Sequence, residues 1–304
     1  MKRFLVVICS FLCMSVFLFS CKTSGVLATV GGVLGEMAGI EGSVEMAESI
    51  VNSAESIEKA VEKIDPEQEY YIGRAVAAQI LSKYELANEP ELEKYLNQIC
   101  SALVLNSERP TLFRGYSVGI IDTEEINAFA TSGGHILVST GLIKCATSED
   151  ALAAVLAHEI AHIQLEHSLK AIKTSRVTDA ITKTTFATMT VLSEGEFQEF
   201  SDVFGDVVDE IVAEMVDSGY SKSQEYEADE TALEIMAATG YNPLAMNEML
   251  KVLKINQKGK SGFSVTHPSP DERLKNLKDQ YEHYDIEDTS AYRKERFAKV
   301  MKNF

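Results

Sequence analysis

Two histidines four residues apart enclose a glutamate in the segment HEIAH, residues 158–162. An α-helix turns about 100° per residue, so His158 and His162 would lie on one face and could bind one tetrahedral ion such as zinc. Glu159 lies beside them, where it could accept a proton from water on that ion. The other side of this helix carries an apolar stripe, which is formed by Leu152, Leu156, Ile160 and Ile163. We therefore expect a helix that is buried on one side and presents its polar residues to a cleft.

A chance match to H-E-x-x-H is expected in roughly one chain per hundred at this histidine content, so the hypothesis needs a third ligand. His167, His267 and a carboxylate are the candidates. His167 follows His162 by five residues, about 140° further round the helix, and should face solvent or a neighbouring loop. The stronger candidate lies in the segment SKSQEYEADETALEIM, where Glu225 and Asp229 are four residues apart on a second helix and share a face.

Glu225 would complete a site of two histidines and one glutamate, in which the fourth position is left to water. Asp229 could accept a hydrogen bond from the free ring nitrogen of a ligating histidine and so fix its tautomer. Glu227 lies between them in sequence and points elsewhere. In the alternative interpretation these three acids form a solvated face of an acidic protein, whose formal net charge is −18.

Five segments carry a resemblance to a known family. The pair HEIAH and EYEAD resembles the HtpX-like and CAAX-protease-type zinc metallopeptidases, and most of all the BepA-like bacterial envelope lipoproteins. The further segments that agree in order are EQEYYIGRAVAAQIL, NAFATSGGHILVSTGLI and THPSPDERL. Ser132 stands where the family usually has proline before the paired glycines.

The resemblance implies an α+β fold, a predominantly helical zincin-type metalloprotease domain with a small sheet beside the active-site helix. It assigns one Zn²⁺ per chain to His158, His162 and Glu225, with Glu159 as the general base or acid. His267, in the HP segment, would either donate a hydrogen bond to the oxyanion of the reaction or cap the metal in a resting state. As a loop histidine before proline, it could also have neither role.

The resemblance further implies a place for the substrate. The strand GGHILVS is expected to border the cleft as an edge strand, with Gly133, Gly134 and Ile136 in contact with the peptide. An extended peptide could add to such an edge through main-chain hydrogen bonds that depend little on sequence. Unfolded protein segments would then be substrates, and folded ones would not.

The elements that position these residues follow from periodicity and capping. Residues 67–105 predict two helices, residues 116–139 a small sheet, and the remainder is mainly helical. Three helix starts are predicted from the pairs Thr147 with Asp150, Ser221 with Gln224, and Ser269 with Glu272. Asn242-Pro243 opens a further helix after Gly240 ends the previous one. Cys100 and Cys145 are either a disulfide or two buried residues.

The N-terminus resembles that of a bacterial lipoprotein. Residues 1–20 have a basic start and a short apolar stretch, as in a signal peptide, and Cys21 would carry the lipid anchor. In the alternative interpretation the chain is simply secreted and Cys21 is an ordinary residue. Residues 21–43 are expected to be a glycine-rich tether and residues 44–66 an amphipathic helix. The peptidase domain would span residues 67–283, with 184–220 either a lid or a core helix pair, and 284–304 a C-terminal tail.

Together these features predict a zinc endopeptidase that cleaves unfolded or misassembled envelope proteins, anchored by lipid and facing the periplasm. The acidic charge argues against nucleic acid as a partner and against electrostatic docking on anionic lipid. The alternative is a non-proteolytic envelope chaperone or assembly factor with a structural zinc site. A plain lipoprotein with a chance motif is the third interpretation, and it predicts no stoichiometric zinc.

Overall fold

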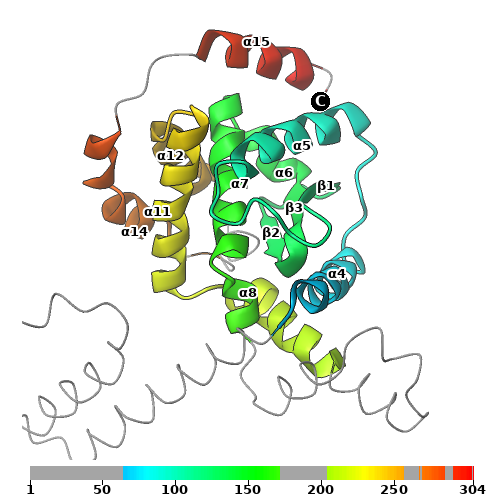
Figure 1. Cartoon of the computed structure of the whole chain (residues 1–304). Coiled ribbons are helices and arrows are strands. Elements are labelled where there is room, and N and C mark those ends of the chain that lie inside the picture. The colour runs from blue at the N-terminus through cyan, green and yellow to red at the C-terminus, as the bar shows by residue number, and fades with distance from the viewer. Residues whose placement is uncertain (1–63, 172–203, 257–266, 268, 285–289, 303) are drawn as a thin grey trace, which may run out of the picture. The chain divides into compact units, whose positions relative to one another are not determined.

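The computed structural model describes residues 64–171, 204–256, 267, 269–284, 290–302 and 304 (Figure 1). All of them belong to one unit, Val61–Phe304. The expected signal peptide, Cys21, the tether, nearly all of the 44–66 helix and most of the 184–220 segment lie outside the described residues. Within the described part of the chain, no helix is long and apolar enough to cross a membrane.

Two helices occupy the region where residues 67–105 predicted them. Helix α4 (Pro66–Leu81) starts at Asp65, whose carboxylate accepts from two backbone N–H groups while Gln68 completes a capping box. Helix α5 (Pro90–Val104) buries the face that was predicted from the leucine and isoleucine spacing. The members of that face are Leu92, Leu96, Ile99 and Leu103, each at most 3% exposed.

The small sheet has three strands, β1 (Ser117–Ile121), β2 (Ala128–Thr131) and β3 (His135–Ser139), in the order β1-β3-β2. Strand β3 runs parallel to β1 and antiparallel to β2. A short 3₁₀ turn, η2 (Ser132–Gly134), joins β2 directly to β3. So short a connection makes β2 and β3 antiparallel neighbours. Strand β1 pairs with the other side of β3, so β3 is the central strand.

The expectation that GGHILVS forms an edge strand was therefore wrong. Ile136 is fully buried and lies opposite Val118 and Ala130. Gly133 and Gly134 have positive φ angles of 75° and 95° and pack against other backbone segments. A Cβ on Gly133 would come within 2.6 Å of the Tyr70 Cα, and one on Gly134 within 2.4 Å of the Gly115 carbonyl oxygen. These three residues build the sheet and its contact with α4, so they are not available to a peptide.

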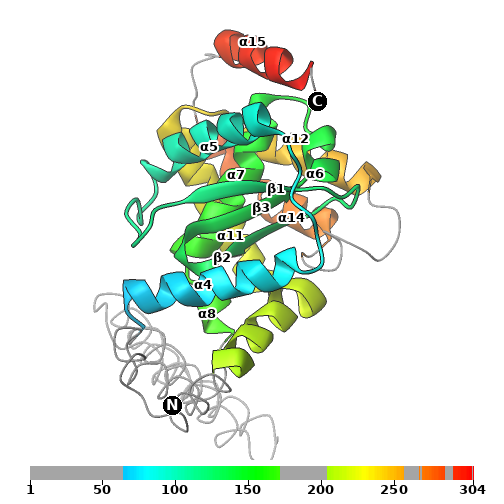
Figure 2. The ribbon, with the colours of Figure 1, turned by 90° about the vertical axis from the view of Figure 1, so that its right-hand side faces the viewer.

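Helix α7 (Glu149–Gln164) is the central element of the helical part. It packs against α5, against β2, and against α11 (Lys222–Thr239) and α12 (Leu244–Asn256), so it lies between the sheet and the later helices (Figures 1 and 2). Every residue from Glu149 to Ile163 is buried. The expected exposure of its polar side to an open cleft is not observed, because α11 covers that side.

Capping places the ends of these helices, with two differences from expectation. Ser221 and Gln224 form the predicted capping box of α11, and Gly240 ends that helix with φ 87°. Helix α7 is capped by Ser148, whose hydroxyl accepts from the Ala151 N–H, and not by Thr147. Ser269 stands at the N-cap of α14 (Pro270–Asn276), but its side chain makes no capping bond.

The acids at the start of α7 bind the C-terminal helix. Residues 284–304, expected as a tail, contain α15 (Ser290–Met301), which packs on α5 and α7. Arg293 Nε lies 2.9 Å from Asp150 Oδ2, and Arg296 binds buried Glu149 with two nitrogens. The unit therefore extends beyond residue 283. The expected cysteine alternatives are also resolved, since Cys100 and Cys145 are free thiols.

Candidate metal centre

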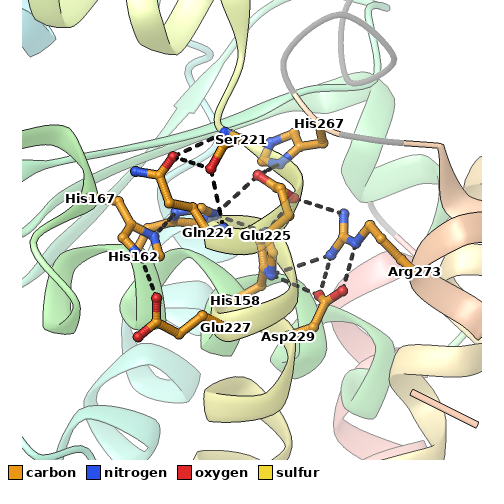
Figure 3. Close-up of polar contacts among 10 residues, drawn as sticks. All are labelled: His158, His162, His167, Ser221, Gln224, Glu225, Glu227, Asp229, His267 and Arg273. Atoms are coloured by element: carbon orange, nitrogen blue, oxygen red, sulfur yellow. Dashed lines mark hydrogen bonds and ion pairs between the residues drawn. The ribbon is translucent and has the colours of Figure 1, made fainter. Parts of the chain in front are cut away.

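Four side chains from three parts of the chain point to a common position (Figure 3). His158 and His162, from α7, have their Nε2 atoms 3.1 Å apart. Glu225, from the first turn of α11, places carboxylate oxygens 3.5 and 3.4 Å from those two nitrogens. The Nδ1 atom of His267 lies 2.8 Å from Glu225 Oε1. One candidate ligand atom from each of these residues lies within 4.8 Å of the others, and all four residues are buried.

The second ring nitrogen of His158, Nδ1, is called its outer nitrogen here because Nε2 belongs to the cluster. It faces a buried ion pair. Its Nδ1 atom is 3.0 Å from Asp229 Oδ1, the geometry expected for a residue that fixes the histidine tautomer. Arg273, from α14, binds both oxygens of Asp229, and its Nη2 atom is 3.2 Å from the same His158 nitrogen. Its Nη1 atom is 3.5 Å from Glu225 Oε2. Sequence reasoning missed Arg273, although it lies in the family-like segment THPSPDERL.

The outer nitrogen of His162 faces another histidine, which corrects the expectation for His167. The two Nδ1 atoms are 2.8 Å apart, and His167 is fully buried. Helix α7 ends at Gln164, and Glu166 then adopts a left-handed conformation with φ 56°. Since this turn interrupts the helix, helical spacing no longer applies, and α8 (His167–Lys170) starts with its first ring folded back on His162. On its far side, His167 Nε2 is 3.4 Å from Glu227 Oε2.

One arginine holds this turn in place. Arg109 Nη1 donates to the Ile163 carbonyl at 3.1 Å, at the C-terminal end of α7 where carbonyl groups lack helical partners. The same guanidinium is 3.2 Å from the Glu166 carboxylate and 2.7 Å from that of Glu69, on α4. These contacts stabilise the reversal that brings His167 to the site.

Two further polar groups next to the centre have no partner within the described residues. Glu159 is 2% exposed, and its Oε1 atom has no hydrogen-bond partner there. Burial raises the pKa of Glu159, against the opposing effect of His158 and His267. The ring of Tyr220 stacks on His162 at 4.3 Å and 19°, and its hydroxyl is likewise unpartnered among the described residues. Burial, followed by Glu159 and Glu225, holds the pKa of Tyr220 well above 10.

The protonation pattern suits a cation between the rings. If His158 donates from Nδ1 to Asp229 and His162 from Nδ1 to His167, then the two Nε2 atoms carry lone pairs that face each other. Burial and Arg273 act to lower the pKa of His158, but Asp229 and Glu225 outweigh them and raise it to about 9, so at neutral pH a bound cation would replace the proton on His158 Nε2. Burial lowers the pKa of His162 to about 4.

Glu225 is the third electron-rich group of the cluster. Burial alone would raise its pKa, yet the neighbouring histidines hold that pKa well below the usual range, so it is a carboxylate. Two imidazole nitrogens and one carboxylate form a donor set that binds zinc in proteins, and the residues present therefore fit such an ion.

The profile described as Peptidase family M48 matches residues 90–281, which is more than half of the chain and includes the whole four-residue cluster. The chain belongs to peptidase family M48. M48 enzymes are zinc-dependent metalloproteases. The resemblance inferred from HEIAH and EYEAD, the metalloprotease class and the mostly helical α+β fold are thereby confirmed.

Relatives of this M48 chain include bacterial and mitochondrial proteases. It is 26% identical over 239 residues to the beta-barrel assembly-enhancing protease of Yersinia pestis, an alignment that covers 77% of this chain and 48% of that one. The protein of the same name from Escherichia coli K12 is 26% identical, with 68% and 42% covered. The metalloprotease LoiP of Escherichia coli K12 is 25% identical, with 62% and 71% covered. The chain thus spans less than half the length of the first two relatives.

Proposed function

We propose that this chain is a zinc-dependent endopeptidase that hydrolyses unfolded or misassembled proteins of the bacterial cell envelope. The observation that carries the proposal is the convergence of His158, His162 and Glu225 around one position, with Glu159 buried beside it. Family membership supports the enzyme class, while the residue roles rest on this geometry and on the motif match. A structural zinc site would not require a free carboxylate at Glu159.

One Zn²⁺ would be held by His158, His162 and Glu225, and it would supply a Lewis acid that activates water and polarises the scissile carbonyl. Asp229 orients His158 through its outer nitrogen. Glu159 takes a proton from the attacking water and returns it to the leaving amine. Burial raises the pKa of Glu159, which favours the first step because a carboxylate of raised basicity binds a proton more readily at neutral pH.

His267 acts as a cap in the resting enzyme. Of its two alternative roles, the contact of its Nδ1 with Glu225 at 2.8 Å favours a position as fourth ligand over one as oxyanion donor. If His267 holds the fourth position of the ion, a substrate carbonyl could bind there only after this ring has moved away. His267 therefore has to leave the cluster before a peptide bond can be cleaved.

Strand β2 is the better candidate for holding the substrate, now that β3 is central. Among the described residues β2 pairs with β3 alone, and it packs against α7. The Ser139 N–H donates to the Asn127 carbonyl, so by alternation the backbone groups of Ala128 and Ala130 point away from β3, where the Ala128 N–H donates to Asn127 Oδ1. All four residues of β2 are at most 3% exposed, so an extended peptide would bind this edge only once the groups that cover it have moved aside.

The envelope location rests on the N-terminal sequence and on the relatives. Two of them are named as beta-barrel assembly-enhancing proteases, which supports a task in protein quality control of the envelope. Residues 1–20 as a signal peptide and Cys21 as a lipid anchor would hold the domain at a membrane on the periplasmic side.

The test compares the wild-type chain with Glu159→Gln, using zinc analysis and cleavage of a permanently unfolded protein. Glu234→Gln, an exposed position on α11, is the matched control. We expect one zinc per chain in all three proteins, and cleavage by the wild type and the control only. Equal, nonzero cleavage by wild type and Glu159→Gln would contradict the mechanism. Stoichiometric zinc with no cleavage by any of them, but suppression of client aggregation, would favour the assembly-factor alternative.

A further inference from the structure

Tyr220 occupies a position that the backbone builds specifically. It follows Gly219, whose φ of 72° and ψ of 164° lie in a region that essentially only glycine adopts. It precedes Ser221, the cap of α11. This arrangement sets the Tyr220 ring flat on His162, with centroids 4.3 Å apart, and 5.8 Å from the ring of His167. The phenol is thus in direct contact with a proposed zinc ligand.

The hydroxyl of Tyr220 differs from those of Tyr95 and Tyr241, two other buried tyrosines. Tyr95 and Tyr241 both donate to Glu149, at 2.9 and 3.1 Å. The Tyr220 hydroxyl has no hydrogen-bond partner among the described residues, and neither has Oε1 of Glu159. A phenol is a hydrogen-bond donor at neutral pH, while the carboxylate is an acceptor. An unpartnered donor and an unpartnered acceptor in one buried centre leave both open to a group that binds there.

We propose that the Tyr220 hydroxyl donates a hydrogen bond to the carbonyl oxygen of the scissile peptide bond as that oxygen gains negative charge. This role rests on the proposed function. His267 does not act as the oxyanion donor in this structure, because its Nδ1 atom lies 2.8 Å from Glu225 Oε1. Tyr220 is therefore a catalytic residue of the hydrolysis, beside Glu159.

The step balances without a change in Tyr220. The water oxygen bonds to the carbonyl carbon, the π-electron pair moves to the carbonyl oxygen, and Glu159 takes the proton. When the C–N bond breaks, the oxygen returns its electron pair and the amine receives the proton from Glu159. Tyr220 keeps its proton throughout. The contact is strongest when the oxygen is anionic, which is the condition for acceleration.

The test is Tyr220→Phe, which removes the hydroxyl and keeps the stacking ring. Tyr281→Phe is the matched control, because its hydroxyl is also buried without a partner among the described residues, but its ring is not stacked on the ligand histidines. We expect kcat of Tyr220→Phe to fall about 10²- to 10³-fold, as on removal of one oxyanion donor. KM, zinc content and the urea midpoint of the metal-free chain should stay unchanged, or the midpoint should rise.

A binding measurement gives a second readout that does not depend on turnover. A phosphinic peptide that mimics the tetrahedral state should bind Tyr220→Phe at least tenfold more weakly than wild type. An ordinary peptide of the same sequence is tested with the inactive Glu159→Gln variant. Adding Tyr220→Phe to that variant should leave its affinity for the ordinary peptide unchanged. Unchanged kcat, or a loss of kcat in step with lost zinc or lowered stability, would overturn the role. If the wild type cleaves nothing, the proposed function itself fails and this role fails with it.

Discussion

Replacement of His167 by leucine should weaken zinc binding, although His167 is not among the four residues whose ligand atoms converge in the structure. In the structure its Nδ1 atom is 2.8 Å from His162 Nδ1, inside a fully buried environment. For His162 to present a lone pair at Nε2, its proton has to sit on Nδ1, and His167 is the group that can accept it. Leucine fills a similar volume but accepts nothing.

The size of the effect follows from that single bond. Without His167, the metal-bound form of His162 keeps a buried N–H with no acceptor, which costs about 1–3 kcal/mol. The alternative is the tautomer with the proton on Nε2, which blocks the metal. A loss of about 10- to 100-fold in zinc affinity is the corresponding range for an outer partner of a metal-bound histidine. Glu227→Gln is the control, since that carboxylate is 54% exposed and 3.4 Å from His167, and should change the affinity less than about threefold.

Competition with a chromophoric chelator measures both variants against wild type. His167→Asn should restore part of the affinity if its amide oxygen reaches the N–H of His162. Zinc affinity of His167→Leu within about threefold of wild type would refute the tautomer argument, provided that the variant is folded by circular dichroism. It would mean that the contact between the two rings is packing only.

Three other changes test the supporting structure. Asp229→Asn should lower zinc affinity about 10- to 100-fold in the same chelator assay, and an unchanged affinity would remove Asp229 from the centre. Gly219→Ala should reduce the free energy of unfolding in urea by about 1–3 kcal/mol, because alanine is strained at φ 72° and ψ 164°; full stability would show that the chain relaxes there. A chain ended after Tyr284 loses α15 and leaves Glu149 and Asp150 without their arginines, so its free energy of unfolding should fall by at least about 2 kcal/mol, with an unchanged urea midpoint as the contrary result.

The metal cluster could be predicted because its spacing is local. His158 and His162 are one helical turn apart, and the capping box of Ser221 and Gln224 fixes where α11 begins, so Glu225 falls in its first turn. Periodicity likewise gave the buried face of α5. What joined the two helices in the prediction was the family motif, since nothing in the spacing itself brings residue 225 near residue 158.

Features that depend on long-range order or on unusual backbone were missed. In the sheet, β1 pairs with β3 and not with β2. The alternation of apolar residues predicts where a strand lies, but not which strand it pairs with. The error at His167 came from Glu166, because glutamate rarely adopts positive φ and the sequence has no glycine to mark the turn. Arg273 and Tyr220 have no periodic signal. The ion-pair partner of Arg273 is 44 residues away, and the two rings that Tyr220 contacts are 53 and 58 residues away.

The proposed mechanism requires Asp229 and Arg273 to keep holding His158 while His267 leaves the cluster. Arg273 binds Asp229, so α14 is held to α11 and the orientation of His158 is maintained. His267 belongs to the same segment but lies before Pro270, the first residue of α14. If His267 is the proposed cap, a peptide would displace it while Arg273 and Asp229 keep their bonds, and the ligand geometry would survive the opening. If the cap were carried on α14 itself, its release would break the Arg273 contacts and disorder His158 at the moment when catalysis requires it.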